Sequence, residues 1–319
     1  MKRSVLFTAV AALFLTASCA GTATPTKIEP PIRQGWDNEE HKSLYGDVES
    51  VTITDYKLAD KFGEVIKVGI EDKRVYKFNL KGDVVAYSHY KGNDSLDDKL
   101  LYKYDSQGNM IESAQYKSDG SLDFKEFYKY DSQGNMIEEA LYDGNGSLYS
   151  KTLYKYDLQN NKIEEAYYEG ESLDGKVLYK YDSSGNVIEE AGGARSGNVF
   201  VFWNDIYKYD SQGNMIEHAR YSGDGSLDFK EFYKCDSQGN MIEEHAIYDC
   251  NGSLEDTTRY KYNSQGNMIE AANYNSDGSL CSKYLYKYDS QGNWIEKACY
   301  MGEIMKPVSM VERVIAYRK

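Results

Sequence analysis

Two short runs of alternating side chains follow one another along most of the chain. One is residues 127–130 (Phe-Tyr-Lys-Tyr), and the other is residues 136–142 (Met-Ile-Glu-Glu-Ala-Leu-Tyr). Alternation with a period of two, rich in tyrosine, isoleucine and phenylalanine, predicts β-strands with two different faces. Asp-Ser-Gln-Gly-Asn separates the two runs. This sequence favours a type I turn followed by a glycine at positive φ, so each pair of runs is predicted to form a β-hairpin.

The asparagine that closes this turn recurs at intervals of 25–28 residues. Its positions are Asn109, Asn135, Asn161, Asn186, Asn214, Asn240, Asn267 and Asn293. A fixed period in this range indicates an array of structural repeats. In one copy Asn160 replaces the glycine, and asparagine is the next-best residue for a left-handed conformation. A second tight turn, such as Asp119-Gly120-Ser121, leaves no room for a crossover, so successive strands should pair antiparallel.

The predicted fold is therefore all-β: an elongated, curved, antiparallel up-and-down meander of β-hairpin repeats. The eight clear repeats, a degenerate one near residues 76–90 and the end strands give about 20 strands. A twisted sheet of that width should curl, coil or close, and we expect a curved or superhelical sheet. Parity places Ile111 and the lysines on one face. It places Glu112, Ala114, Tyr116 and the paired tyrosines on the other, without deciding which face is concave.

The remaining segments suggest an exported protein. Residues 1–18 have a basic start and a short apolar stretch, typical of a signal peptide. Leu15-Thr16-Ala17-Ser18-Cys19 resembles a bacterial lipobox, which implies acylation of Cys19. We expect a tether over 19–36, an N-terminal β cap over 37–75, repeats over 76–300 and a C-terminal capping strand over 301–319. An ordinary secretory signal with an incidental Cys19 is the alternative.

The repeated Tyr-x-Tyr-Asp-x-x-Gly-Asn pattern over residues 76–300 resembles the YD-repeat (Rhs-type) family and its shorter envelope lipoproteins. The resemblance implies spiralling β-sheet shells and an envelope scaffold, and it supplies no catalytic residues. The absence of Asp after Cys19 implies, by the same kind of resemblance, the outer membrane, with either the periplasmic or the surface face. The formal charge of −14 opposes phosphate backbones, so nucleic-acid binding is not expected.

Two sets of aromatic residues are candidates for binding. Phe200, Phe202 and Trp203 lie in the one repeat that departs from the pattern, and irregular segments often carry binding residues. The repeated tyrosines could stack on sugars or on docked loops, although pairing between strands explains them equally well. The tyrosines singled out are Tyr102, Tyr104, Tyr128, Tyr130, Tyr154 and Tyr156.

Sequence evidence for other chemistry is weak. Adjacent glutamates point to opposite faces of a strand and make poor acid–base pairs, so no enzyme activity is expected. Asp143-Gly144-Asn145-Gly146 has Tyr154 where a calcium loop needs glutamate. His218 and His245 are predicted to lie two strands apart, and we expect neither a metal nor a cofactor. Cys281 and Cys299 are predicted on neighbouring strands and are candidates for a disulfide.

These observations favour a non-enzymatic, membrane-anchored envelope lipoprotein whose β-repeats form a scaffold for macromolecular interaction. Its partner would be a protein or a glycan of the cell envelope, and it would contact the membrane only through its lipid anchor. The alternative is a glycan- or peptidoglycan-binding module that uses the tyrosine-rich face.

Overall fold

The computed structural model describes residues 44–197, 199–247, 254–302 and 306–319, in which twenty β-strands form one sheet. The strands are β1 (Val48–Lys61), β2 (Glu64–Phe78), β3 (Val84–Lys91), β4 (Leu96–Tyr104), β5 (Met110–Lys117), β6 (Leu122–Tyr130), β7 (Met136–Asp143), β8 (Leu148–Tyr156), β9 (Lys162–Glu169), β10 (Ser172–Tyr181), β11 (Val187–Ser196), β12 (Val199–Tyr209), β13 (Met215–Ser222), β14 (Leu227–Cys235), β15 (Met241–Ile247), β16 (Leu254–Tyr262), β17 (Met268–Asn275), β18 (Leu280–Tyr288), β19 (Trp294–Met301) and β20 (Ser309–Tyr317). Among these residues, no helix has the length and apolar character needed to cross a membrane.

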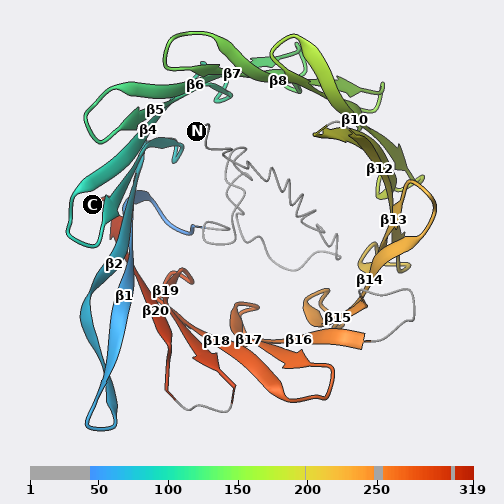
Figure 1. Ribbon diagram of the computed structural model, residues 1–319. Helices are drawn as coiled ribbons and strands as arrows, with labels where there is room; N and C mark the ends of the chain where they lie inside the picture. Colours follow the sequence, from blue (N-terminus) through green and yellow to red (C-terminus); the bar gives the residue numbers. More distant parts are fainter. Residues whose placement is uncertain (1–43, 198, 248–253, 303–305) are drawn as a thin grey trace.

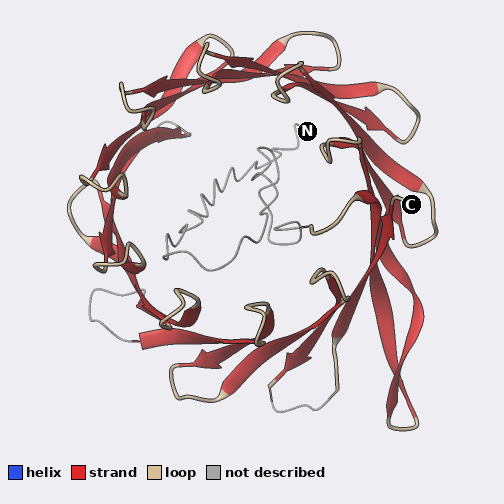
Figure 2. Ribbon diagram, turned by 180° about the vertical axis from the view of Figure 1, so that it is seen from behind, coloured by secondary structure: helices blue, strands red, loops and turns tan. Residues whose placement is uncertain are grey.

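The sheet closes on itself. Each strand pairs antiparallel with its neighbours in chain order, and β1 also pairs with β20, from Val48 opposite Tyr317 to Tyr56 opposite Met310. The result is a large barrel with a radius of 19 Å, seen as a ring in Figures 1 and 2. The predicted antiparallel, up-and-down order is confirmed. The predicted elongated, open meander is wrong, because the first and last strands meet.

Two β-bulges in most repeats, one within the hairpin and one where it pairs with the next, explain why the sheet bends far enough to close. In β4 and β5 one register shift falls between Lys103 and Tyr104. Between β5 and β6 another falls between Gln115 and Tyr116. Equivalent shifts recur in the following hairpins. Each bulge bends its strand and increases the local twist. Repetition of both bulges around the array therefore accumulates the curvature that brings β20 to β1.

The first bulge also changes which side chains share a face. Because Ile111 and Glu112 together oppose Lys103, all three lie on one face, where Glu112 and Lys103 form an ion pair of 2.9 Å. Ala114 and Tyr116 follow Glu112 onto this face. The parity prediction was therefore wrong for these residues, since strict alternation ignores a bulge.

The face with the ion pairs is the outside of the barrel, and the tyrosine face is the inside. Side chains on a concave wall converge and cover one another, whereas those on a convex wall spread apart. Ile111 is 37% exposed and the Lys103 side chain 64%, whereas on the opposite face Glu165 is 5% and Asp205 is 1% exposed. The structure thus assigns the concave face that the sequence left open.

The turns between paired strands follow the predicted chemistry. The backbone N–H of Gly108 donates to the Asp105 carbonyl, and Gly108 has a φ of 95°. The Asp105 carboxylate accepts the N–H groups of Gln107 and Asn109. Asn160 takes the glycine position with a φ of 65°. The prediction of a type I turn followed by a left-handed residue is confirmed, including its substitution by asparagine.

The last such turn joins the two ends of the described chain. In six of the other turns the asparagine side chain donates to the aspartate of its own turn, as Asn109 does to Asp105 at 3.0 Å. Asn293 instead donates to the Tyr45 carbonyl at 2.9 Å and to the Tyr317 hydroxyl at 2.7 Å. A buried apolar cluster lies along the same seam and contains Val48, Val51, Ile53, Tyr76, Phe78 and Val84. Apolar burial and this asparagine together stabilise the closure.

One tyrosine hydroxyl in each repeat ties a hairpin to the hairpin before it. The Tyr130 hydroxyl donates to the Met110 carbonyl at 2.8 Å. This carbonyl belongs to the bulged end of β5, where the ladder is interrupted. The same bond is made by Tyr104, Tyr156, Tyr181, Tyr209, Tyr262 and Tyr288. Cys235 occupies this position in β14, where the shorter side chain has no phenol to reach the preceding hairpin.

We predict that Tyr130→Phe lowers the free energy of unfolding by about 1 kcal/mol, because it leaves the Met110 carbonyl without its donor. Cys235→Tyr should raise the stability, since it restores the repeated bond. Urea unfolding followed by circular dichroism measures both. Equal stability of Tyr130→Phe and the wild type would show that the hydroxyl bond contributes nothing.

Candidate functional site

A row of carboxylates and tyrosines lines the inner face between β6 and β15. Seven of these ten strands place one acidic side chain each at nearly the same height because the register repeats, whereas β8, β10 and β13 carry Thr152, Val177 and His218 there. The acidic residues are Glu126, Glu139, Glu165, Glu190, Asp205, Glu231 and Glu244. Tyrosine hydroxyls donate to several of them, for example Tyr154 to Glu139 at 2.9 Å and Tyr260 to Glu244 at 2.8 Å. We call these seven residues the inner carboxylate row.

The inner carboxylate row has shifted pKa values. Burial, together with the hydrogen bond and charge of Glu126, raises the pKa of Glu139 to about 7. Burial and the charge of Asp205 raise the pKa of Glu190, whose Oε1 is buried without a hydrogen-bond partner. Burial raises the pKa of Tyr102 to about 12, so this phenol stays neutral. The inner face therefore combines carboxyl groups of raised pKa with phenol donors in one band.

A network of charged residues interrupts the row at β12–β14. Arg220 makes two hydrogen bonds of 2.8 Å to Asp205. His218 lies 3.1 Å from Asp205 and 3.1 Å from Glu231. Burial alone would lower the pKa of His218, but hydrogen bonds and charge from these two carboxylates raise it to about 9. His218 is thus a buried cation within an ion network. His245 lies on the outer face, with Thr257 and Glu243 as partners.

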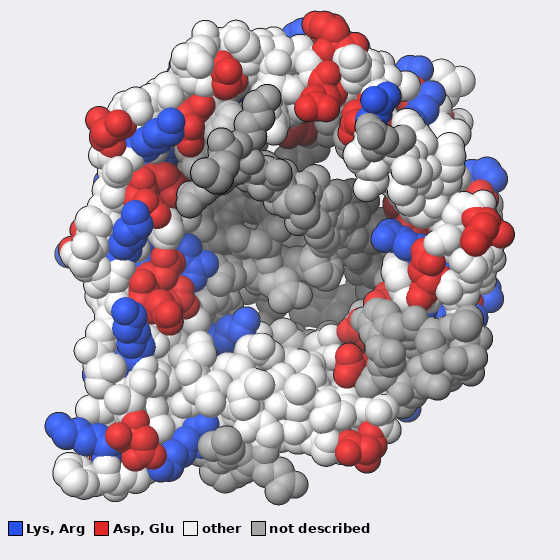
Figure 3. Space-filling view, in the orientation of Figure 1, with Lys and Arg blue, Asp and Glu red and all other residues white. Residues whose placement is uncertain are grey.

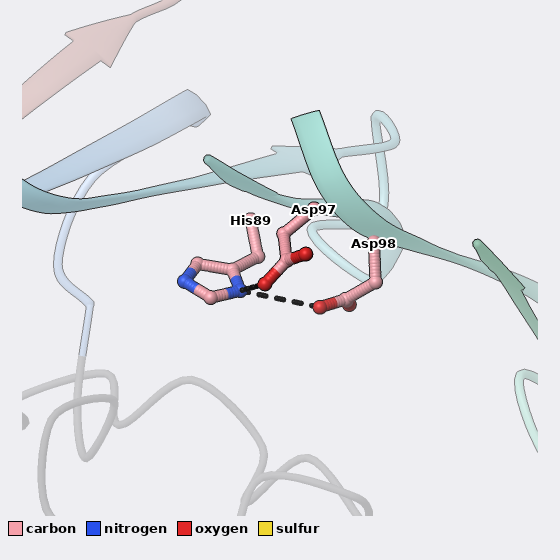
Figure 4. A group of neighbouring side chains, drawn as sticks. All are labelled: His89, Asp97 and Asp98. Carbon is pink, nitrogen blue, oxygen red and sulfur yellow. Dashed lines mark hydrogen bonds and ion pairs between the residues drawn. The ribbon is translucent and has the colours of Figure 1, made fainter. Parts of the chain in front are cut away.

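A second polar cluster lies on the inner face where β3 meets β4. His89 projects from β3, and Asp97 and Asp98 project toward it from β4 (Figure 4). His89 Nδ1 lies 3.2 Å from Asp98 and 3.7 Å from Asp97, while its Nε2 bonds to Asp72. Burial would lower the pKa of His89, but its hydrogen bonds to Asp72 and Asp98 raise it. The His89 nitrogen and one carboxylate oxygen each of Asp97 and Asp98 lie within 4.8 Å of one another.

All six tyrosines proposed from the sequence lie on the inner face. Tyr128 and Tyr154 donate to glutamates of the inner carboxylate row. The hydroxyls of Tyr104, Tyr130 and Tyr156 bond to backbone carbonyls of neighbouring hairpins, and Tyr102 packs against the seam cluster. These contacts give the tyrosines a structural role in the wall and leave their ring faces half-buried.

The three aromatic residues of the irregular repeat do not lie together. Phe200 and Phe202 point outward from β12 with ring centroids 5.4 Å apart, and they are 43% and 57% exposed. Trp203 points inward and packs against Val177, Tyr179 and Val187. Gly192 lies opposite Trp203 in the register, and a Cβ there would come within 2.4 Å of the indole. The glycines of β11 therefore make room for the aromatics of β12.

The cysteines of the last repeat are free. Cys281 is exposed on β18, and Cys299 on β19 lies opposite Tyr284 rather than opposite Cys281. The predicted disulfide is not formed, because the two residues are offset along their strands. Cys19, the signal peptide and the tether lie outside the described residues.

Sequence reasoning missed Asp205, His89 and Asp98, and it did not place His218 in a buried network. For His89, Asp98 and His218 a signal was present, because each departs from what the other repeats carry at its position, whereas Asp205 stands where other repeats carry Glu126 and Glu231. Their convergence depends on the bulged register, which alternation alone does not reveal.

Comparisons with known proteins find a distant structural likeness only. No family model matches the chain, and no curated protein matches it. A crystal structure of TcdB2-TccC3-Cdc42 shares 14% identity at a TM-score of 0.35, over 81% of this chain and 16% of that chain. The chain thus spans a small part of that much longer protein. A porin-like protein from Bacteroides uniformis shares 8% identity at a TM-score of 0.37, over 86% of this chain and 99% of that chain.

A further porin-like protein, from Bacteroides vulgatus, shares 13% identity at a TM-score of 0.34. It matches over 62% of this chain and 95% of that chain.

We predict that Glu139 makes the protein less stable as the pH rises from about 4.5 to about 7. Its pKa in the folded state is about 7 against an ordinary 4.5, so the folded protein binds more protons than the unfolded chain in this window. Glu139→Gln should remove this part of the pH dependence and increase the stability at pH 8. Thermal unfolding between pH 4 and pH 8 measures it.

Glu138→Gln is the matched control, because Glu138 is the adjacent residue on the outer face and pairs with Lys129. The outer substitution should leave the slope between pH 4.5 and pH 7 unchanged. A Glu139→Gln variant that keeps the wild-type slope would contradict the assignment to the inner carboxylate row.

Proposed function

We propose that this protein is a non-enzymatic, membrane-anchored envelope lipoprotein whose barrel is a scaffold for another macromolecule. The observation that carries the proposal is the closed wall with acidic and phenolic groups on most of the strands from β6 to β15, on its inner face. A repeated surface of this kind offers many equivalent contacts and no single reactive centre, which suits binding an extended partner better than catalysis.

The charged residues of the outer face favour a barrel whose outer wall contacts water and not lipid. Seven hairpins carry an ion pair on this face beside the Asp-x-x-Gly-Asn turn or its variant: Lys103–Glu112, Lys129–Glu138, Lys155–Glu164, Lys180–Glu189, Lys208–Glu217, Lys261–Glu270 and Lys287–Glu296. Nearer the middle of the wall, Lys125, Lys176 and Lys230 pair with Glu112, Glu164 and Glu217. Figure 3 shows basic and acidic side chains interleaved around the ring. A wall that faces lipid needs an apolar band, and charges at that depth cost several kcal/mol. We therefore propose that the barrel lies outside the bilayer and that acyl chains on Cys19 anchor the protein to the outer membrane.

The inner face favours a polypeptide with basic side chains as the partner. The inner carboxylate row supplies seven acidic groups. Three basic side chains, Lys162, His218 and Arg220, are paired with members of this row, so acidic groups are in excess. Acidic surfaces attract basic segments and set their orientation. The tyrosine hydroxyls are engaged within the wall, which weakens the alternative of sugar binding through the tyrosine-rich face.

The exposed Phe200–Phe202 pair supports the second candidate function, glycan binding. Its two exposed rings lie on the outer face with centroids 5.4 Å apart and planes tilted by 39°, where a sugar could pack against them. This candidate places the ligand on the opposite side of the wall from the inner carboxylate row, so the two functions can be separated by substitution.

We predict that the double variant Glu139→Gln, Glu190→Gln loses partner capture from envelope extracts, measured by pull-down and mass spectrometry. The matched variant Glu138→Gln, Glu189→Gln changes the adjacent outer residues and should capture as the wild type does. Equal capture by both variants would contradict a role for the lumen. Binding on a glycan array that is lost with Phe200→Ala, Phe202→Ala would establish the sugar-binding function instead.

We predict that metabolic palmitate labelling of the protein is lost with Cys19→Ala and retained with Cys235→Ala. Attachment through more than one acyl chain gives stable membrane association, so Cys19→Ala should also move the protein to the soluble fraction. Labelling that persists in Cys19→Ala would remove the anchor from the proposed function.

A further inference from the structure

We propose that His89, Asp97 and Asp98 form a binding site for a divalent transition-metal ion of the zinc type. The cluster lies at one end of the β3–β4 hairpin on the inner wall, with the three side chains about one-quarter to one-third exposed. A metal entering from the lumen would meet one imidazole nitrogen and two carboxylate oxygens. The remaining coordination position would be open to water.

The distances between the ligand atoms fit such an ion. Bonds of about 2.0–2.1 Å in tetrahedral geometry place neighbouring ligand atoms about 3.3–3.4 Å apart. His89 Nδ1 lies 3.2 Å from the Asp98 oxygen and 3.7 Å from the Asp97 oxygen. The two carboxylate oxygens also lie within 4.8 Å of each other, and rotation of these side chains would bring all three ligand atoms to one ion.

The opposite side of the imidazole is already oriented. His89 Nε2 bonds to Asp72, and Asp72 is itself held by Arg74 Nε at 3.1 Å. A carboxylate that accepts the second ring N–H fixes the tautomer and orientation of a metal-binding histidine, and it makes the ligating nitrogen more basic. Binding of the metal would displace the proton that Nδ1 otherwise carries.

The position occurs once among the described hairpins, as a specific site requires. At the places equivalent to His89 opposite Asp98, the other hairpins pair Gln115 with Phe124, Leu141 with Ser150, Tyr167 with Gly175, Arg220 with Phe229, Ala246 with Asp256 and Asn273 with Ser282. The bulge adds the third ligand, because Asp97 is the extra residue of β4 and lies beside Asp98 on the same face.

A lysine competes with the metal for one of the ligands. Lys91 forms an ion pair of 2.6 Å with Asp97 and is 60% exposed at its side chain. Removal of this ammonium group should free Asp97 for the metal. Lys91→Met is therefore expected to tighten metal binding, a gain that local unfolding of the hairpin could not produce.

The test is a titration of the reduced full-length protein in detergent with Zn²⁺ by calorimetry and with Co²⁺ by absorbance. We expect one site whose Co²⁺ spectrum lacks a thiolate charge-transfer band, which separates it from the free cysteines. Asp98→Asn and His89→Gln should weaken binding at least about tenfold, and Asp72→Asn about tenfold by loss of orientation. Lys91→Met should strengthen it.

His245→Gln is the matched control, because His245 lies on the outer face with a single carboxylate partner. It should bind as the wild type does. Absence of a thiolate-free site in the wild type would overturn the proposal. So would unchanged binding in His89→Gln, or weaker binding in Lys91→Met.

Discussion

The pairing of β1 with β20 is the constraint on which the rest of the structure depends. An open sheet of twenty strands would leave two edges of unpaired N–H and C=O groups, which promote association with other chains. Closure satisfies these groups within the chain. It also creates two unlike surfaces, a convex wall with ion pairs and a concave wall with phenols and carboxylates. The difference in burial between the two walls follows from that closure, and so does the contribution of burial to the shifted pKa values on the inner face.

Each hairpin supplies a hydrogen-bond donor for a backbone carbonyl at the bulge of the hairpin before it. The bulge at the start of β5 interrupts the ladder, and the Tyr130 hydroxyl of the next hairpin donates to the Met110 carbonyl at that place. The repeated sequence thus specifies both the bulge that bends the sheet and the tyrosine whose hydroxyl bonds to the carbonyl at that bulge. This explains why the second tyrosine recurs so regularly, whereas other positions on the inner face vary more.

Much of the fold can be predicted from the sequence, because turns and strands are local properties. The glycine or asparagine at positive φ, the antiparallel order and the approximate number of strands all follow from residues within one repeat. Closure could not be predicted, since it is the sum of many small bends. The faces of Glu112, Ala114 and Tyr116 were wrong for a related reason: one extra residue opposite Lys103 reverses the alternation. The inner carboxylate row depends on that same reversal.

In a repeat protein, functional side chains are best sought where the pattern is broken on more than one neighbouring strand. A single change, such as Cys235 for tyrosine, alters the stability of one unit. Changes that converge across strands bring together groups that the repeat itself does not combine. Asp205, His218 and Arg220 form one such group, and their charges are satisfied by one another. His89, Asp97 and Asp98 form another, in which the ligand atoms face the lumen and the imidazole is oriented from behind. The first group is complete without a ligand, whereas the second has the donor set and the spacing of a site that receives one.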